Sequence, residues 1–299
     1  MKKNCIKSMT FFILLLVFSV GLTASGFAVA TGGVTAVEAQ QTNEEIVAEV
    51  LNDPTVSVAA KAQVQAKADF VATYRDDPEA AIQALQNFNA QQGNIITPGA
   101  IITSGGSFTA QLPLSLQSIS VGDPAYYALA VTPIRQETNT WCAAATIQQT
   151  LRYIRGTSYV LPTQSAIMGT VHSGPGLNTV LSYLNTKQTR NTYIRANAST
   201  KDAFDDLLAY STLSFSPMVF TLKATSTANW PFTTQGHFTN CDGFYAATNA
   251  GYLISDPYYF PHYLPNVTIA NPGYLPRNFT QLKNVNTTLM GTSYMQVGY

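Results

Sequence analysis

The chain has 299 residues, no net formal charge at pH 7, and only 11% charged residues against 46% hydrophobic ones. A hydrophobic content of this size is ordinary for a folded globular protein and argues against a disordered chain. The scarcity of Lys and Arg argues against a nucleic-acid-binding protein, which needs basic residues clustered on one surface.

The first 30 residues have the pattern of a bacterial secretory signal peptide. Three lysines within the first seven residues precede an apolar run at 9–22, and Ala28-Val29-Ala30 is an A-x-A cleavage site. We therefore expect residues 1–30 to be removed and the protein to be secreted, with cell-surface association as a variant of this. An uncleaved signal would instead leave a membrane anchor, although its apolar core is shorter than the ~20 residues of a spanning helix.

Residues 42–89 predict a group of amphipathic helices. Thr42 and Glu45 form a capping box before the first helix, which should end at Asp53-Pro54, and the third helix should begin at Asp77-Pro78. The expected buried faces are Ile46, Val47, Val50 and Leu51 in the first helix, Val64, Phe70, Val71 and Tyr74 in the second, and Ile82, Leu85 and Phe88 in the third.

These helices, with a Gly- and Ser-rich linker at 91–120, are interpreted as a pro-segment at 31–120. Residues 40–120 hold eight acidic and three basic residues, whereas 121–299 hold seven acidic and ten basic ones, so the two parts have opposite charge. We expect the pro-segment to dock on the later domain and cover its cleft, with processing near Thr103–Ser107. The alternative is a small independent helical domain or spacer.

Residues 121–299 predict a second domain in which helices come first and strands follow. Expected helices begin at Cys142 and at Thr163-Gln164, and two more cover 177–184 and 202–210. Expected strands are 218–222, 237–246, 251–255 and 293–297. This order indicates an α+β domain rather than a parallel α/β sheet.

Cys142 is the first candidate for catalysis. Ile147, Leu151 and Ile154 recur at helical spacing after it, which places the thiol at a helix N-terminus, where free backbone N–H groups favour the thiolate. Gln136, six residues upstream, has a side-chain amide that could donate to an oxyanion formed at Cys142.

His237 and Asp256 complete the expected arrangement. His237 opens one predicted strand and Asp256 ends the next, so an antiparallel hairpin would bring the two side chains close together. Acyl transfer uses such a series of a thiolate, an imidazole that acts as base and then acid, and a carboxylate that orients the imidazole. Alone, His237 could equally be a structural histidine. His172 and His262 lie in loop-like contexts and are expected at the surface.

Three further features allow a purely structural interpretation as well as a functional one. Cys142 and Cys241 could form one disulfide after export, or Cys241 could lie near Cys142 as part of a redox switch. The acidic residues at 202–206 are expected to be a solvated helix face rather than a metal site. Trp230 and Tyr258-Tyr259 are expected to flank the cleft, with packing as their commoner role.

The sequence resembles papain-like cysteine peptidases. The resemblance covers roughly residues 130–260 and is closest to a bacterial secreted branch related to bacteriocin-leader-processing peptidases (peptidase C39-like). It depends on Gln136 followed by five residues and Cys142, on Thr163-Gln164, on Gly236-His237 with Gly243-Phe244, and on Asp256-Pro257. Ala143 departs from the pattern, because many members have Gly or Trp there.

The resemblance implies a two-lobe fold, with Cys142 in a helical lobe and His237 and Asp256 in an antiparallel β lobe. It implies a thiol peptidase made as a pre-proenzyme, with peptides or proteins as substrates and Gln136 with the Cys142 N–H as oxyanion donors. Two alternatives stay open, a cell-wall amidase or acyltransferase with the same residues, and an inactive binding module on a peptidase-like scaffold. No metal, nucleotide or other cofactor is predicted.

Overall fold

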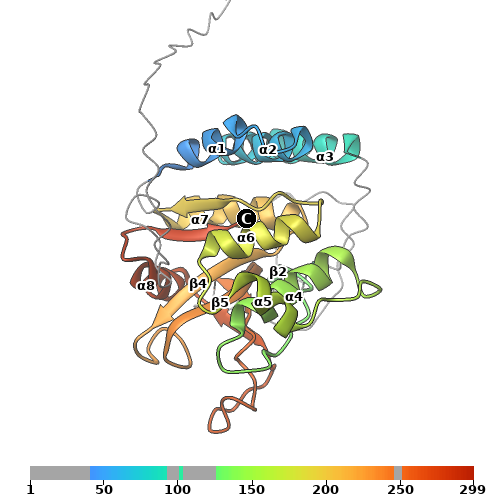
Figure 1. Ribbon diagram of the computed structural model, residues 1–299. Coiled ribbons are helices and arrows are strands. Elements are labelled where there is room, and N and C mark those ends of the chain that lie inside the picture. The colour runs from blue at the N-terminus through green and yellow to red at the C-terminus, as the bar shows by residue number, and fades with distance from the viewer. Residues whose placement is uncertain (1–40, 93–100, 104–125, 246–250) are drawn as a thin grey trace, which may run out of the picture. The chain divides into compact units, whose positions relative to one another are not determined.

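The computed structural model describes residues 41–92, 101–103, 126–245 and 251–299 (Figure 1). All of them belong to one compact unit. The expected signal peptide, the processing region around Thr103–Ser107 except Thr103 itself, and residue 246 of the expected strand lie outside the described residues.

The fold is α+β, as the order of predicted elements indicated. The described helices are α1 (Asn43–Asn52), α2 (Val58–Tyr74), α3 (Pro78–Gln91), α4 (Cys142–Arg155), α5 (Gln164–Val171), α6 (Leu177–Lys187), α7 (Lys201–Leu213) and α8 (Phe279–Met290). The described strands are β1 (Ile101–Thr103), β2 (Tyr126–Leu129), β3 (Arg195–Ala198), β4 (Met218–Ala224), β5 (Thr234–Tyr245), β6 (Tyr252–Ser255), β7 (Tyr274–Arg277) and β8 (Met295–Gly298).

The strands form one antiparallel sheet in the order β1-β2-β5-β4-β8-β3, and β6 adds to β5 with β7 beside it. The long strand β5 is the centre of this arrangement, because it pairs with β2, β4 and β6. Every pairing is antiparallel, so the end of one strand lies beside the start of its neighbour, and short connections can join them.

Two large hydrophobic clusters stabilise the fold, and a small third one contains Leu129, Val131 and Phe215. The first joins α4, α5 and α6 to Val219 and Phe238 of the sheet. The second joins α2, α3, α7 and α8 to other sheet residues, among them Phe220 and Leu222. Because successive residues of a strand point to opposite faces, Val219 and Phe220 show that the clusters lie on opposite faces of β4.

The local signals predicted most helix ends correctly. Thr42 caps α1 and makes the reciprocal capping box with Glu45, Asp77 caps α3 with Pro78 after it, and Thr163 caps α5. Helix α4 begins at Cys142 and buries Ile147, Leu151 and Ile154, as predicted. The expectation that His237 opens its strand was wrong by three residues, since β5 begins at Thr234.

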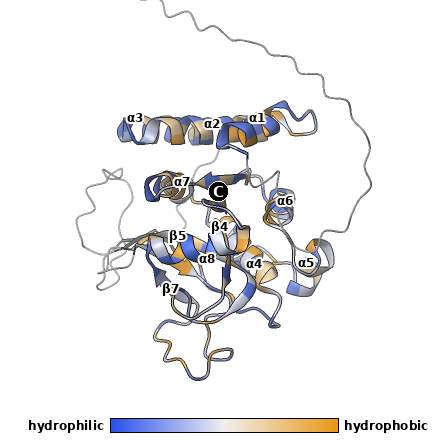
Figure 2. Cartoon of the chain, turned by 90° about the vertical axis from the view of Figure 1, so that its left-hand side faces the viewer, coloured by the Kyte–Doolittle hydropathy of each residue, from blue (hydrophilic) through white to orange (hydrophobic). Residues whose placement is uncertain are grey.

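Helices α1–α3 pack on the second cluster, beside α7 and β3, as Figures 1 and 2 show. Arg75 contacts two carboxylates of α7, Asp202 at 3.0 Å and Asp206 at 2.8 Å. Lys67 is fully buried among the rings of Tyr193, Tyr210 and Tyr299, and its Nζ donates to the main-chain oxygen of Tyr299. These helices therefore share the core of the domain that follows them.

Candidate active site

Cys142 is the first residue of α4 and is 9% exposed. The N-cap residue Trp141 makes no side-chain capping bond, and the first turn holds no acidic residue. The backbone N–H groups of that turn therefore have no side-chain cap and stay available to an anion beside Cys142.

His237 lies on β5, 4% exposed, and connects Cys142 to Asp256. Its Nε2 is 2.9 Å from Asp256 Oδ1, and the side chain of Cys142 is close enough to raise the pKa of His237 as well. Since Nε2 is used by Asp256, Nδ1 is the ring nitrogen left for the thiol. Burial alone would lower the pKa of His237, but the charges of Asp256 and Cys142 and their hydrogen bonds outweigh it and raise the pKa to about 10.

The carboxylate of Asp256 follows the last residue of β6 and is fully buried. Besides His237, its Oδ1 accepts the backbone N–H of Tyr258 at 2.7 Å, and its Oδ2 accepts Trp230 Nε1–H at 3.1 Å. Both oxygens thus have donors, which fixes the plane of the carboxylate and, through it, the imidazole. Trp230 packs behind Asp256, and sequence spacing gave no sign of this bond.

The register of the sheet brings these residues together. Asn240 of β5 pairs with Ser255 of β6, so the residue after Ser255 lies near His237, three positions back along β5. The loop after β6 is fixed by a hydrogen bond from Asp256 N to Gly273 O of 2.7 Å. Gly273 has φ +82° and lies so close to Pro133 that an added Cβ would be 2.2 Å from the Cβ of that proline.

Gln136 lies on the segment before α4 and is buried, but its amide is turned away from the cleft. Nε2 donates to Thr138 O at 2.6 Å, and Oε1 has no hydrogen-bond partner among the described residues. Gln136 is not among the residues that line the cleft around Cys142. The structure therefore brings Cys142, His237 and Asp256 together, and the oxyanion role of Gln136 stays a prediction.

Gln164, the first residue of α5, holds the segment on which Gln136 lies. Its Nε2 donates to Arg135 O at 3.0 Å, and its Oε1 accepts Glu137 N–H at 2.8 Å. The main chain of Gln136 between them is fixed by Pro257 O at 3.1 Å. The position of Gln136 is thus set by the helical part and by the loop that holds Asp256.

Cys241 lies in the second cluster, away from Cys142 in the first, and both are free thiols. Cys241 is four residues from His237 along β5, about 13 Å at the usual rise of a strand. The alternative of a disulfide with Cys142 is therefore not found, and neither is the alternative of Cys241 beside the thiol of Cys142, because a disulfide needs Cα atoms within about 7 Å. Burial raises the pKa of Cys241 well above the ordinary value.

His172 and His262 are exposed, as predicted. The acidic residues of α7 pair with side chains of this chain, since Asp202 and Asp206 bind Arg75 and Asp205 contacts Lys201 and Tyr252. Within the described residues, no group of three or more His, Cys, Asp or Glu side chains could hold a metal ion.

Cys142 and His237 open into a cleft of about 500 Å³. One wall is the glycine-rich segment 173–176 and another is 232–236, before and within the start of β5. Tyr258 lines the cleft as expected, whereas Thr221 and Phe232, together with Leu289 and Met290 of α8, were not predicted as cleft residues. Among the described residues, no Asp, Glu, Lys or Arg lines this cleft.

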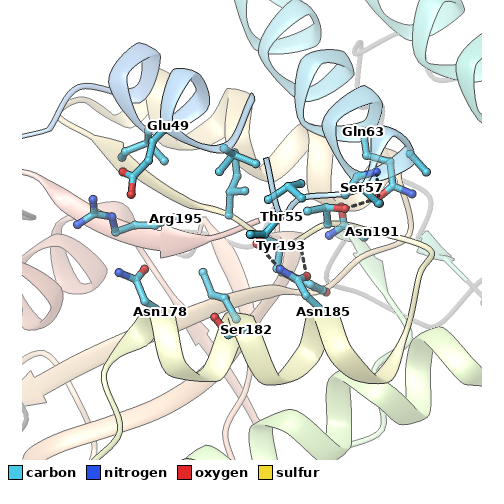
Figure 3. A pocket seen from close by; sticks show the side chains of 18 of the residues that line it. Glu49, Thr55, Ser57, Gln63, Asn178, Ser182, Asn185, Asn191, Tyr193 and Arg195 are labelled. Atoms are coloured by element: carbon cyan, nitrogen blue, oxygen red, sulfur yellow. Dashed lines mark hydrogen bonds between the residues drawn. The ribbon is translucent and has the colours of Figure 1, made fainter. Parts of the chain in front are cut away.

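A second cavity, of about 670 Å³, lies between α1–α2 and the α6–β3 region (Figure 3). Its polar side chains are largely used within the protein, as when Asn185 binds the main chain of Tyr193 and Gln63 binds Thr192. Helices α1 and α2 line this cavity, and no described residue of α1–α3 lines the Cys142 cleft. The expected cover of the cleft by these helices is therefore not found.

In the part of the chain that the structure describes, no helix is both long and apolar enough to cross a membrane. A scan against protein-family models and a search of curated proteins each found no match to this chain.

Proposed function

We propose that this chain is a secreted, papain-like cysteine peptidase that hydrolyses peptide bonds. The observation that carries the proposal is the series of contacts from Cys142 through His237 to Asp256, at the edge of a cleft. A thiol at a helix N-terminus, an imidazole in contact with it and a buried carboxylate behind the imidazole form the arrangement that activates a sulfur nucleophile.

The arrangement of the elements supports the papain-like part of the proposal. The helices α4–α6 carry Cys142, and the sheet carries His237 and Asp256. The two groups meet along α4 and β5, where the side chain of Asn240 makes two hydrogen bonds to α4. Its Nδ2 donates to Gln149 Oε1, and its Oδ1 accepts from Thr150 Oγ1. The cleft opens at the end of this contact.

The proposed reaction proceeds in two halves. Because the pKa of His237 is about 10, its imidazolium already holds the proton from Cys142 at neutral pH, and the sulfur attacks the carbonyl carbon of the scissile bond. The imidazolium then gives this proton to the leaving amine, and an acyl-enzyme forms. In the second half, His237 takes a proton from water, the water oxygen attacks the acyl carbon, and Cys142 leaves as the thiolate beside the imidazolium, which restores the starting pair.

Charge on the substrate oxygen needs hydrogen-bond donors. The backbone N–H of Cys142 is one donor, as at other helix N-termini that bind anions. Gln136 would be the second, which requires its amide to turn away from Thr138 O when a substrate enters. Its amide nitrogen carries a second N–H, so a smaller adjustment would also bring a donor forward.

The role proposed for residues 31–120 changes in one respect. Helices α1–α3 dock on the second cluster and add Lys67 to its interior, so they assist folding of the domain or tether it. An inhibitory pro-segment would have to act through residues outside the described helices.

The test is hydrolysis of a denatured protein and of a mixed peptide library by the purified secreted protein, with new termini identified by mass spectrometry. We expect cleavage that falls about 10³-fold or more in Cys142→Ala and about 10²-fold or more in His237→Ala. His262→Gln is the matched control, because His262 is exposed and outside the cleft. Release of muropeptides from purified murein without cleavage of any peptide would replace this proposal with the amidase alternative.

A further inference from the structure

The floor of the Cys142 cleft contains a buried hydroxyl group without a partner. Thr221 lies in the middle of β4, is 1% exposed and lines the cleft. Its Oγ1 makes no hydrogen bond to any described residue, whereas its main-chain oxygen accepts Asn286 Nδ2–H at 2.7 Å. A buried polar atom without a partner costs free energy, so such an atom in a cleft indicates a site for a polar group of a ligand.

The strand register directs the Thr221 side chain toward the first hydrophobic cluster, of which Cys142 is a member. Thr221 is opposite Phe238 in the antiparallel pair of β4 and β5, so the two side chains are neighbours on one face. Phe238 packs in the cluster that contains Cys142 and α4, as does Val219, two residues before Thr221. Phe220 and Leu222 point to the other cluster.

The walls around the hydroxyl are apolar. Phe238 lies beside Thr221, and the last turn of α8 adds Leu289 and Met290 to the same cleft. Helix α8 is held in place because Asn286 binds both Thr221 O and Gln296 O. A side chain that binds beside Thr221 would therefore contact hydrocarbon from Phe238, Leu289 and Met290 as well as the hydroxyl group.

Charge complementarity excludes ionic side chains. No described Asp, Glu, Lys or Arg lines the cleft, and His237 is already paired with Asp256, so a charged side chain would be desolvated without a counter-ion of its own. The Thr221 hydroxyl both donates and accepts, and a carboxamide offers both an acceptor and a donor to it. Glutamine also has two methylene groups that match the apolar walls.

We propose that this part of the cleft is a subsite for a glutamine side chain of the peptide substrate, and that Thr221 selects it. The inference rests on the proposed peptidase function. Thr221 takes no part in the chemistry at Cys142, so it determines which peptides are cleaved and not whether the thiol reacts.

The test compares kcat/KM for peptides that differ at one residue only, carrying Gln, Glu, Leu or Met at each position near the scissile bond in turn. At one position we expect Gln to exceed Leu and Met about tenfold, and Glu to be the poorest. Thr221→Val, which keeps the shape of the side chain, should lower kcat/KM for the Gln peptide about tenfold and leave the Leu peptide unchanged. Thr221→Ser should keep the Gln preference.

Thr179→Val is the matched control, because Thr179 is an exposed threonine of α6 that does not line the cleft. It should leave the Gln preference unchanged. Equal effects of Thr221→Val on the Gln and Leu peptides, or no effect, would overturn the subsite while cleavage and labelling of Cys142 still support the peptidase. No cleavage of any peptide together with an unreactive Cys142 would overturn the proposed function and the subsite with it.

Discussion

The bond between Trp230 and Asp256 offers a test of how the catalytic carboxylate is held. Both side chains are fully buried, and Trp230 Nε1 is 3.1 Å from Asp256 Oδ2. In Asp256→Asn the one remaining oxygen is needed by His237 Nε2 and Tyr258 N, so the new NH₂ group faces the indole N–H. Loss of the charge-assisted bond and the opposed donors should lower the free energy of unfolding by about 1.5–3 kcal/mol.

Trp230→Phe removes the same bond from the other side. It leaves Oδ2 without a donor and a void where the second ring was, so we expect a loss of about 2–4 kcal/mol. In the double variant the indole N–H that opposes the new NH₂ group is gone. The free energy of unfolding should therefore fall by about 1–3 kcal/mol less in the double variant than the sum of the losses in the two single variants.

The assay is urea unfolding of the four proteins followed by far-ultraviolet circular dichroism, because Trp141 and Trp230 both contribute to the fluorescence. If the loss in the double variant equals the sum of the two single losses within about 0.5 kcal/mol, Trp230 and Asp256 are not energetically coupled, and the proposed role of their bond is refuted.

Three further outcomes can be measured by the same unfolding assay. The free energy of unfolding of Lys67→Met should match or exceed that of the wild type at pH 7, because burial lowers the pKa of Lys67 and Tyr299 O keeps Ile194 N–H as a donor. Lys67→Ala leaves a cavity and should lose about 2–5 kcal/mol. A large loss in Lys67→Met would contradict this. The pKa of His237 is raised from 6.5 to about 10 on folding, so its stabilisation should be full below about pH 6.5 and disappear as the pH rises through about 10; a difference between wild type and His237→Gln that is independent of pH would refute it. Gly273→Ala should lose at least about 1 kcal/mol more than Gly156→Ala, since both glycines have positive φ but only Gly273 has a neighbour in the way; equal losses would contradict the close approach.

Local signals explain why much of the helical part could be predicted from the sequence. A cap such as Thr42 with Glu45 acts within one turn, so its effect is written in adjacent residues. The apolar spacing after Cys142 likewise defines the buried face of α4 without reference to the rest of the chain.

The elements that were not predicted depend on distant partners. Strand β3 is short and lacks an apolar alternation, and it forms because β8, about 100 residues later, pairs with it. Strand β7 contains Pro276 and pairs on the described chain with β6 only, which suits a proline-containing edge. Helix α8 is rich in Asn and Thr, which are weak helix formers, although Asn278 with Gln281 is a capping box that could have indicated it.

The candidate site shows the same division. Cys142, His237 and Asp256 could be placed from a helix start and a hairpin, and the structure brings these three together. Trp230 could not be assigned to Asp256, because the bond joins a loop to a strand end. The amide of Gln136 was expected in the cleft from its spacing, but its nearest acceptor is Thr138 O, two residues along the chain.

The position of α1–α3 could not be derived from charge asymmetry. The opposite net charge of the two parts does not explain the docking, because the ion pairs of Arg75 run the other way. Arg75 belongs to the acidic part, and its partners Asp202 and Asp206 belong to the basic part. Charge alone does not say which face is covered, and the apolar residues Val64 and Phe70 select the second cluster instead of the cleft.

An activated thiol at Cys142 is tested most directly by site-resolved labelling of Cys142 and Cys241, the free thiols of the described residues, with a thiol-directed peptide electrophile at neutral pH, read by mass spectrometry. Cys241 is fully buried and serves as the internal control. We expect rapid label on Cys142, little on Cys241, and at least tenfold slower labelling of Cys142 in His237→Ala. Labelling of Cys142 that is no faster than that of a free cysteine, and unchanged in His237→Ala, would contradict an activated thiol in this protein.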